Sequence, residues 1–191
     1  MTLLICGMLL WSLTHLFPSA MHDARSKIVA GIGTNAYRGL FSLLIAASLL
    51  LIIFGWKSAA LSGLYVPPLF GSILPSILLL FSFVLFVAAQ THTNIKRFVR
   101  HPQLTGVAVW GIAHLLTNGD SRSVALFGGM TLWALVMVIL CGRRDGPWQK
   151  PGPVALGSDI VTVVVGVIAY CILLYAHQFL FGVAPIANFP G

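Results

Sequence analysis

The sequence predicts an all-α membrane protein, a polytopic helical bundle of about six transmembrane helices. Of its 191 residues, 58% are hydrophobic and 8% are charged, whereas about 25% of the residues of an ordinary soluble domain are charged. The apolar residues form continuous runs rich in Leu and Ala, whereas a transmembrane β-barrel needs short segments of alternating polarity. Most of the surface therefore faces lipid, which excludes a soluble globular enzyme, a disordered chain and a coiled coil.

Six apolar segments are separated by turn residues or charged residues. A helix needs about 20 mostly apolar residues to span the hydrocarbon core, so six segments with their loops leave no room for a separate soluble domain. The fourth segment, with roughly 14 residues, is short for a span. In chain order the segments run from Thr2 to Phe17, where Pro18-Ser19 closes the helix, and then over Tyr37–Trp56, Phe70–Gln90, Leu104–Thr117, Val124–Cys141 and Val154–Phe181.

The basic residues lie in alternate loops, which predicts the orientation. Cytoplasmic loops of membrane proteins carry an excess of Lys and Arg. The three loops that follow the first, third and fifth segments hold nine of the eleven basic residues, so we expect these loops in the cytoplasm and both termini in the periplasm. The nine are Arg25, Lys27, Arg38, Lys96, Arg97, Arg100, Arg143, Arg144 and Lys150, whereas Lys57 and Arg122 lie in the opposite loops.

The net charge of +7 does not indicate a nucleic-acid partner, because the basic residues form short clusters between apolar runs. The cysteines Cys6, Cys141 and Cys171 contain no C-x-x-C pair and lie within or at the ends of apolar segments. We therefore expect no disulfide framework and no zinc site. The sequence indicates neither an internal repeat nor a low-complexity linker.

Two of the six histidines, His15 and His114, lie within apolar segments. An ionisable residue inside a span is costly, rare and usually functional. By helical rise, His15 lies about 20 Å from the outer start of its segment and His114 roughly 15 Å from the inner start of its own, which predicts similar depths. Two imidazoles at one depth suit a b-type haem with two axial histidine ligands. The alternative is a pair of neutral histidines that hydrogen-bond to neighbouring helices.

Small and aromatic residues accompany His114 in the fourth segment. Gly106 and Gly111 would leave room for a macrocycle, and Trp110, four residues before His114, would line the same helix face. Trp110 and Gly111 are therefore candidate haem-contacting residues. Ordinary packing between helices explains an aromatic residue at this position equally well.

Arg38 and His101, near the predicted cytoplasmic surface, are candidates for contact with a haem propionate. The guanidinium of Arg38 can pair with a carboxylate through two hydrogen bonds, and His101 could also contact the head group of a substrate. The alternatives are lipid-phosphate contact for Arg38 and helix capping or simple exposure for His101. The other histidines, His22, His92 and His177, are expected in loops or near the ends of spans and not as haem ligands.

Several short motifs together resemble the signature of the NnrU family. The resemblance covers roughly residues 10 to 145 and implies a single NnrU-like transmembrane domain over residues 1–191. Such proteins are small polytopic proteins of the bacterial inner membrane linked to nitrite and nitric oxide reduction. The motifs are Arg100-His101-Pro102-Gln103-Leu104, Ala113-His114-Leu115-Leu116, Asn118-Gly119-Asp120 and Phe127-Gly128-Gly129, with His15-Leu16 and Tyr37-Arg38-Gly39 upstream.

The family also includes 15-cis-zeta-carotene isomerase, a haem b enzyme with two histidine ligands. Its ligand motifs align with His15 and His114, so the resemblance implies haem b on this pair. A cysteine implicated in ligand exchange in the isomerase is replaced here by Gly111, and Leu16 and Phe17 follow the pattern of the denitrification branch.

Three functions are consistent with these features. The first is a membrane haem protein that supports denitrification, with a respiratory redox partner. The second is a haem-dependent cis-trans isomerase that acts on a lipophilic, carotenoid-like polyene in the bilayer. The third is a haem-free transporter or assembly factor. A transporter would usually show paired repeats or broken helices with charged residues at the midplane, which the sequence does not indicate.

Overall fold

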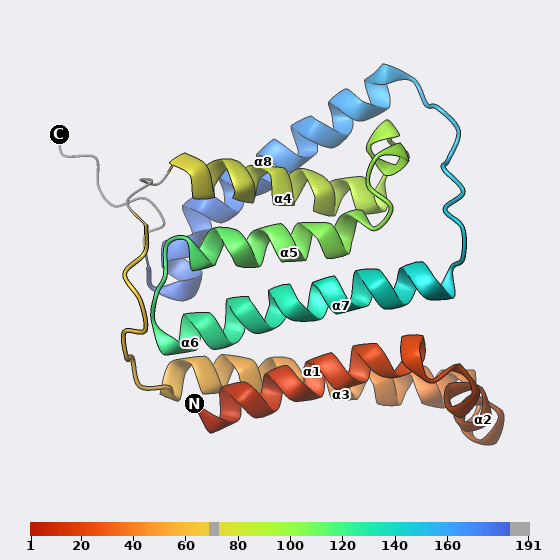
Figure 1. Ribbon diagram of the computed structural model, residues 1–191, viewed down its shortest axis with the longest axis horizontal. Helices are drawn as coiled ribbons and strands as arrows, with labels where there is room; N and C mark the ends of the chain where they lie inside the picture. Colours follow the sequence, from red (N-terminus) through yellow and green to blue (C-terminus); the bar gives the residue numbers. More distant parts are fainter. Residues whose placement is uncertain (69–72, 184–191) are drawn as a thin grey trace.

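In a computed structural model, which describes residues 1–68 and 73–183, the protein is a bundle of long helices. Figure 1 shows most of them running nearly parallel or antiparallel to one another. The helices are α1 (Thr2–Ala20), α2 (His22–Ile32), α3 (Thr34–Ser58), α4 (Ile73–Gln90), the 3-10 helix η1 (Asn94–Arg97), α5 (Pro102–Leu115), α6 (Ser121–Ser123), the π-helix η2 (Val124–Gly128), α7 (Gly129–Arg144) and α8 (Leu156–Phe181).

Five helices of the described chain are long and apolar enough to cross a membrane. They are α1, α3, α4, the continuous helix over Ser121–Arg144 and α8. Many of their large hydrophobic side chains are exposed on the surface of the bundle, as at Leu43, Leu132 and Ile172, which are each more than 60% exposed. A soluble protein rarely exposes so large an apolar surface. The helical membrane bundle predicted from composition is thereby confirmed. The fourth predicted segment forms α5, which at 14 residues is shorter than a full span.

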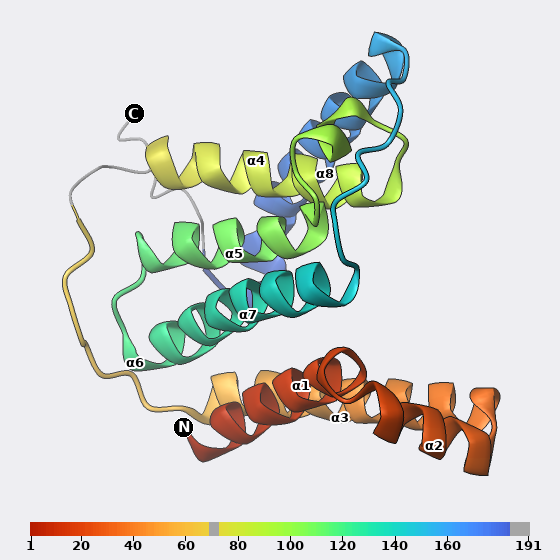
Figure 2. The same ribbon diagram turned by 45° about the vertical axis from the view of Figure 1, so that its right-hand side comes forward.

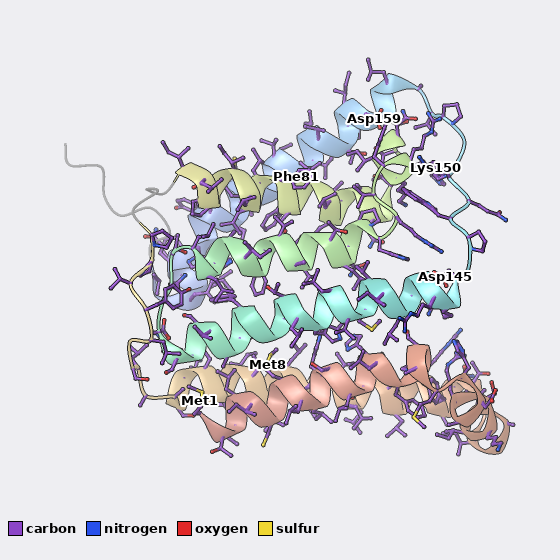
Figure 3. All side chains as sticks on the ribbon, viewed as in Figure 1. Met1, Met8, Phe81, Asp145, Lys150 and Asp159 are labelled. Atoms are coloured by element: carbon purple, nitrogen blue, oxygen red, sulfur yellow. The ribbon has the colours of Figure 1, made fainter. Side chains whose placement is uncertain are left out.

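Glycines let neighbouring helices approach closely, as is common in membrane bundles. A Cβ atom at Gly7 of α1 would lie 2.7 Å from the Ile52 backbone nitrogen of α3, and one at Gly166 of α8 would lie 2.8 Å from the Val84 Cα of α4. Met8, labelled in Figure 3, faces the seam between α1 and α7, where its Cε would lie 2.9 Å from a Cβ at Gly129. The hairpins α1–α3 and α4–α5 and the helix α7 are packed into one bundle through such contacts.

The ends of the helices differ from the predicted segments at several points. Pro18 does not close the first helix, because α1 continues to Ala20 and the Met21 amide still donates to the Phe17 carbonyl. A proline in the last turn removes only one hydrogen bond, which is why the helix tolerates it. The loop after α1 contains a further helix, α2, which the sequence did not predict. The first residues of the third segment, Phe70 to Ser72, lie outside the described residues.

The three basic loops lie at one end of the bundle. In Figures 1 and 2, α2, the η1 segment and the chain between α7 and α8 all lie at the end opposite to Met1. The helix α5 therefore runs from the end with the basic loops to the opposite end, beside α4 and α7 (Figure 1), and its crossing of the membrane stays a prediction. The clustering of the loops is what the charge pattern predicted, and the side of the membrane on which they lie stays a prediction.

Candidate functional site

The two half-buried histidines, His15 and His114, make the same hydrogen bond. The Nδ1 atom of His15 lies 2.9 Å from the Trp11 carbonyl oxygen, and Nδ1 of His114 lies 2.9 Å from the Trp110 carbonyl oxygen, four residues earlier in each helix. A carbonyl only accepts, so Nδ1 carries the proton and Nε2 keeps its lone pair in the neutral ring. A hydrogen bond from the far ring nitrogen to a backbone carbonyl is the contact that commonly orients metal-ligating histidines.

His15 lies in an aromatic cluster formed by α1, α3 and α7. Its ring centroid is 4.3 Å from that of Trp11, 5.3 Å from that of Trp133 and 5.6 Å from that of Phe41. The Trp11 and Trp133 rings meet edge to face at 5.8 Å. The imidazole is therefore enclosed by rings from three helices, with little freedom to turn.

Three polar atoms around His15 have no partner among the described residues. The indole Nε1–H groups of Trp11 and Trp133 and the hydroxyl of Tyr37 are buried without a hydrogen bond to any of them. Tyr37 belongs to this cluster through Phe41, whose ring centroid lies 6.5 Å from its own. Because buried polar groups are almost always hydrogen-bonded, the two unpaired indole donors beside His15, with the Tyr37 hydroxyl beyond Phe41, favour a ligand with acceptor atoms.

His114 lies in a second, similar cluster near the end of α5. Its ring stacks on Phe127 of η2 with centroids 4.3 Å apart and an interplanar angle of 21°. Trp110 lies 4.8 Å from His114 and meets Phe127 edge to face at 4.9 Å. Trp110 therefore holds the imidazole against η2, in the same way that Trp11 holds His15 against Trp133.

The two clusters lie at different depths. Phe127 and Trp133 are six residues apart in one continuous helix, which at the usual rise places them about 9 Å apart along its axis. The sequence predicted similar depths, and a separation of about 9 Å is larger than that prediction. One reason is that α5 begins at Pro102, two residues before the predicted segment, so His114 lies farther from the start of its helix than the segment bounds implied. The coordination of one haem by both histidines stays a prediction.

A third histidine, His177 of α8, lies at the same end of the bundle as His114 (Figure 1). Its Nδ1 lies 2.8 Å from the Val183 carbonyl oxygen. No pattern in the sequence pairs the two, because the packing of α8 against the bundle is a tertiary property. His177 is thus a second potential nitrogen donor at the His114 end of the bundle.

The glycines of α5 contact neighbouring helices. A Cβ atom at Gly106 would lie 2.8 Å from the Phe86 ring of α4, and one at Gly111 would lie 2.7 Å from the Phe127 carbonyl oxygen and still closer to the Thr131 hydroxyl. The space that these glycines were expected to leave open is filled by helix packing. Gly111 nevertheless lies beside the His114 cluster, because it sets the distance between α5 and η2.

The two candidate propionate contacts lie toward the end of the bundle that carries the basic loops (Figure 1). Arg38 is exposed near the start of α3, whereas Arg25 of α2 lies over the Tyr37 ring with its guanidinium carbon 5.5 Å from the centroid. His101 lies at the opposite end of α5 from His114, a separation of 13 residues or about 20 Å. Contact of Arg38 or His101 with a haem propionate stays a prediction.

A short inverted repeat underlies both histidine clusters, which corrects the expectation that the chain has no internal repeat. The pattern Gly-x3-Trp-x3-His-Leu occurs at Gly7-Met8-Leu9-Leu10-Trp11-Ser12-Leu13-Thr14-His15-Leu16 and at Gly106-Val107-Ala108-Val109-Trp110-Gly111-Ile112-Ala113-His114-Leu115. In both copies the glycine packs on an antiparallel neighbour, and the tryptophan and histidine share one helix face. The overlooked signal was that the spacing of four residues between Trp110 and His114 occurs again between Trp11 and His15.

The donor set fits a haem iron better than a metal ion held by protein ligands alone. Within the described residues no three His, Cys, Asp or Glu side chains gather as a metal cluster. Two neutral imidazoles with available Nε2 atoms suit the axial positions of a haem, whose four other ligands come from the macrocycle. The unpaired indole and phenol donors near His15 suit carboxylate oxygens such as those of propionates.

Comparison with protein families gives one match that covers nearly the whole chain. The family described as NnrU protein matches residues 3–185. No curated protein and no solved structure matches the chain.

Proposed function

The chain belongs to the NnrU family, and from this premise we propose that it is an integral membrane protein that binds b-type haem through His15 and His114 and supports nitrite and nitric oxide reduction. The main support is the pair of matching clusters. In each, an imidazole donates Nδ1–H to the carbonyl of a tryptophan four residues earlier and keeps Nε2 available. That combination fixes the tautomer and the orientation that an axial ligand needs.

In this proposal, different residues around the two imidazoles hold the rings in place and bind the carboxylate groups of the haem. Trp133 and Phe127 hold the rings in place from one helix, so that His15 and His114 keep a fixed relationship to each other. The unpaired donors of Trp11, Trp133 and Tyr37 hold carboxylate groups at the His15 end. Bound haem iron would supply a one-electron redox couple inside the bilayer, and the apolar helix faces exclude water from it.

The haem spectrum of the purified full-length protein tests the ligands. We expect a low-spin reduced-minus-oxidised spectrum after expression with ample haem, because two imidazoles give strong axial ligation. His15→Ala and His114→Ala should each remove the low-spin signal or empty the site. His92→Ala is the matched control, because His92 is exposed and lies outside both clusters.

His177→Ala distinguishes the two possible ligand pairs. If His15 and His114 hold the iron, His177→Ala keeps the wild-type spectrum. Loss of the spectrum in His177→Ala together with retention in His15→Ala would replace His15 by His177 as the second ligand. A wild-type spectrum in both His15→Ala and His114→Ala, or a wild-type protein that contains no haem, contradicts the proposal.

The physiological role is tested in a deletion strain of the source bacterium grown without oxygen on nitrite. We expect the wild-type gene to restore nitrite and nitric oxide consumption, and the His114→Ala gene to fail although its protein reaches the membrane. Unchanged consumption in the deletion strain, accompanied by altered isomer composition of its polyenes, would favour the isomerase alternative.

A further inference from the structure

A cavity of about 760 Å³ lies at the end of the bundle where the basic loops gather, away from both histidine clusters. Its wall is formed by the η1 loop, the start of α5 and the segment between α7 and α8. Figure 3 labels Asp145 and Lys150 on that last segment, which arches along this end of the bundle. The residues that matter to the argument are Lys96, Arg100, His101, Leu104, Asp145 and Trp148.

The cavity carries unpaired positive charge. Within the described chain, neither Lys96 nor Arg100 forms an ion pair, and the one hydrogen bond of the Arg100 guanidinium goes to the Gly146 carbonyl oxygen at 2.8 Å. The carboxylate in the wall, Asp145, is already paired with Arg144 at 2.7 Å. The wall therefore presents two basic side chains that form no ion pair with the described residues, and the one carboxylate beside them is paired with Arg144.

His101 adds an unpaired polar atom to the same wall. Its Nε2 is buried and has no hydrogen-bond partner in the described part of the chain. The backbone carbonyl of His101 already accepts from Thr105, so the ring and not the backbone is left to bind a ligand. Because a buried ring nitrogen is normally hydrogen-bonded, the cavity is suited to a polar ligand at this position.

The remaining wall combines apolar side chains with the two amides of Gln103 and Gln149. Ala89 of α4 and Leu104 of α5 line the cavity from the bundle side. Trp148 lies on the opposite side with the Lys150 ammonium 5.2 Å from its ring centroid. Tryptophan and lysine are typical of the level of lipid head groups. A ligand that combines an anionic head with apolar chains matches both parts of the wall.

We propose that this cavity binds the phosphate group of an anionic phospholipid from the surrounding leaflet. Lys96 and Arg100 neutralise the phosphate, His101 Nε2 hydrogen-bonds to the head group, and the acyl chains leave along α4 and α5. Basic pockets between transmembrane helices are known to hold anionic head groups in this manner. The assignment does not depend on haem, because His101 and His114 lie at opposite ends of α5.

Native mass spectrometry of the delipidated full-length protein tests the assignment. The probes are phosphatidylglycerol, phosphatidylcholine and inorganic phosphate. We expect phosphatidylglycerol to bind more tightly than phosphatidylcholine, and Lys96→Gln to weaken phosphatidylglycerol binding about fivefold, since one basic side chain near the head group contributes about 1 kcal/mol. Arg100→Lys keeps the charge and should stay close to wild type, whereas the Lys96→Gln/Arg100→Gln variant should lose at least about tenfold.

Arg143→Gln is the matched control, because Arg143 is exposed at the same end of the bundle but does not line the cavity. It should bind phosphatidylglycerol as the wild type does. Equal weakening by Arg143→Gln and Lys96→Gln would overturn the proposal in favour of general surface charge. Equal binding of the two lipids would also overturn it, and so would binding of inorganic phosphate without a preference for phosphatidylglycerol. The Lys96 side chain makes no ion pair with the described residues, so Lys96→Gln decides the matter if the double variant does not fold.

Discussion

The Tyr65 hydroxyl donates a hydrogen bond to the Asn118 carbonyl oxygen over 2.9 Å, and it also contacts the Leu115 carbonyl oxygen. These contacts attach the loop after α3 to the end of α5 that carries His114. The attachment is reinforced by the Leu64 amide, which donates to the Gly119 carbonyl oxygen at 2.8 Å. The end of α5 beside the His114 cluster is therefore held by a loop that comes from another hairpin.

Tyr65→Phe should loosen this attachment. The substitution removes the one hydroxyl donor that these two carbonyl groups share and keeps the ring, at an expected cost of about 1 kcal/mol because the site is partly open to solvent. Thermal unfolding in detergent should show a lower Tm than the wild type. Tyr175→Phe is the control, because Tyr175 lies exposed on α8. Equal Tm values for wild type and Tyr65→Phe would show that the loop does not stabilise α5.

Asp159→Asn should destabilise the junction between α8 and the η1 loop. The Asp159 carboxylate accepts hydrogen bonds from the Thr93 hydroxyl at 2.5 Å, the Asn94 amide nitrogen at 2.8 Å and the Asn94 side chain at 2.7 Å. Hydrogen bonds to a charged acceptor are stronger than neutral ones. We expect a clear fall in Tm for Asp159→Asn and a smaller one for Thr93→Val, which removes a single donor. A larger fall for Thr93→Val would contradict this assignment.

Asp120 should make the stability of the outer loop depend on pH. Burial acts to raise the pKa of Asp120, but hydrogen bonds from Ser123 and Arg122 and the Arg122 charge hold the pKa below its ordinary value of 3.8. The ionised carboxylate therefore contributes stability above pH 3.8, and this contribution is lost as the pH falls through the lower folded pKa. The Tm difference between wild type and Asp120→Asn should accordingly shrink below pH 3.8. A constant difference would exclude this linkage.

Gly111→Ala should separate α5 from η2. The new methyl group would lie 2.7 Å from the Phe127 carbonyl oxygen and closer still to the Thr131 hydroxyl, and overpacking of this kind costs about 1–3 kcal/mol. Because Phe127 stacks on His114, the haem spectrum should change as well if the proposed ligands are correct. Gly157→Ala in the first turn of α8 is the control, since no atom lies within 4 Å of its added Cβ. An unchanged Tm in Gly111→Ala would mean that α5 and η2 accommodate the added methyl group without a loss of stability.

The orientation in the membrane is tested with alkaline phosphatase fusions. Because the basic loops mark the cytoplasmic side, a fusion after Gly191 should be active and a fusion after Lys150 inactive. A fusion after Arg100 should be inactive as well, which also tests whether α5 crosses the membrane. The reverse activities would invert the topology. If the fusions after Lys150 and after Gly191 were both active, α8 between them would not cross the membrane, and the chain would have one span fewer than the predicted six.

The sequence by itself determined the class of the protein and its family. A composition with 8% charged residues leaves lipid as the only solvent for most side chains, and continuous apolar runs set the number and approximate length of the helices. Both properties depend on local residue content, so they need no tertiary information. The ends of the helices were less well predicted, as Pro18 and the unexpected α2 illustrate. A proline in the last turn of a helix, or an exposed helix in a loop, changes the free energy of unfolding little, so the sequence pattern does not mark it.

Tertiary structure alone decided how the candidate residues are grouped. Helical rise along the predicted segments placed His15 and His114 at similar depths, whereas the helices as folded separate their clusters by about 9 Å. The sequence predicted open space beside Gly106 and Gly111, whereas in the structure the side chains of Phe86 and Thr131 occupy that space. His101 and His177 acquired their neighbours only through the packing of the η1 loop and α8. Contacts between segments distant in sequence depend on which helix faces meet, which the residue pattern of any single helix leaves undetermined.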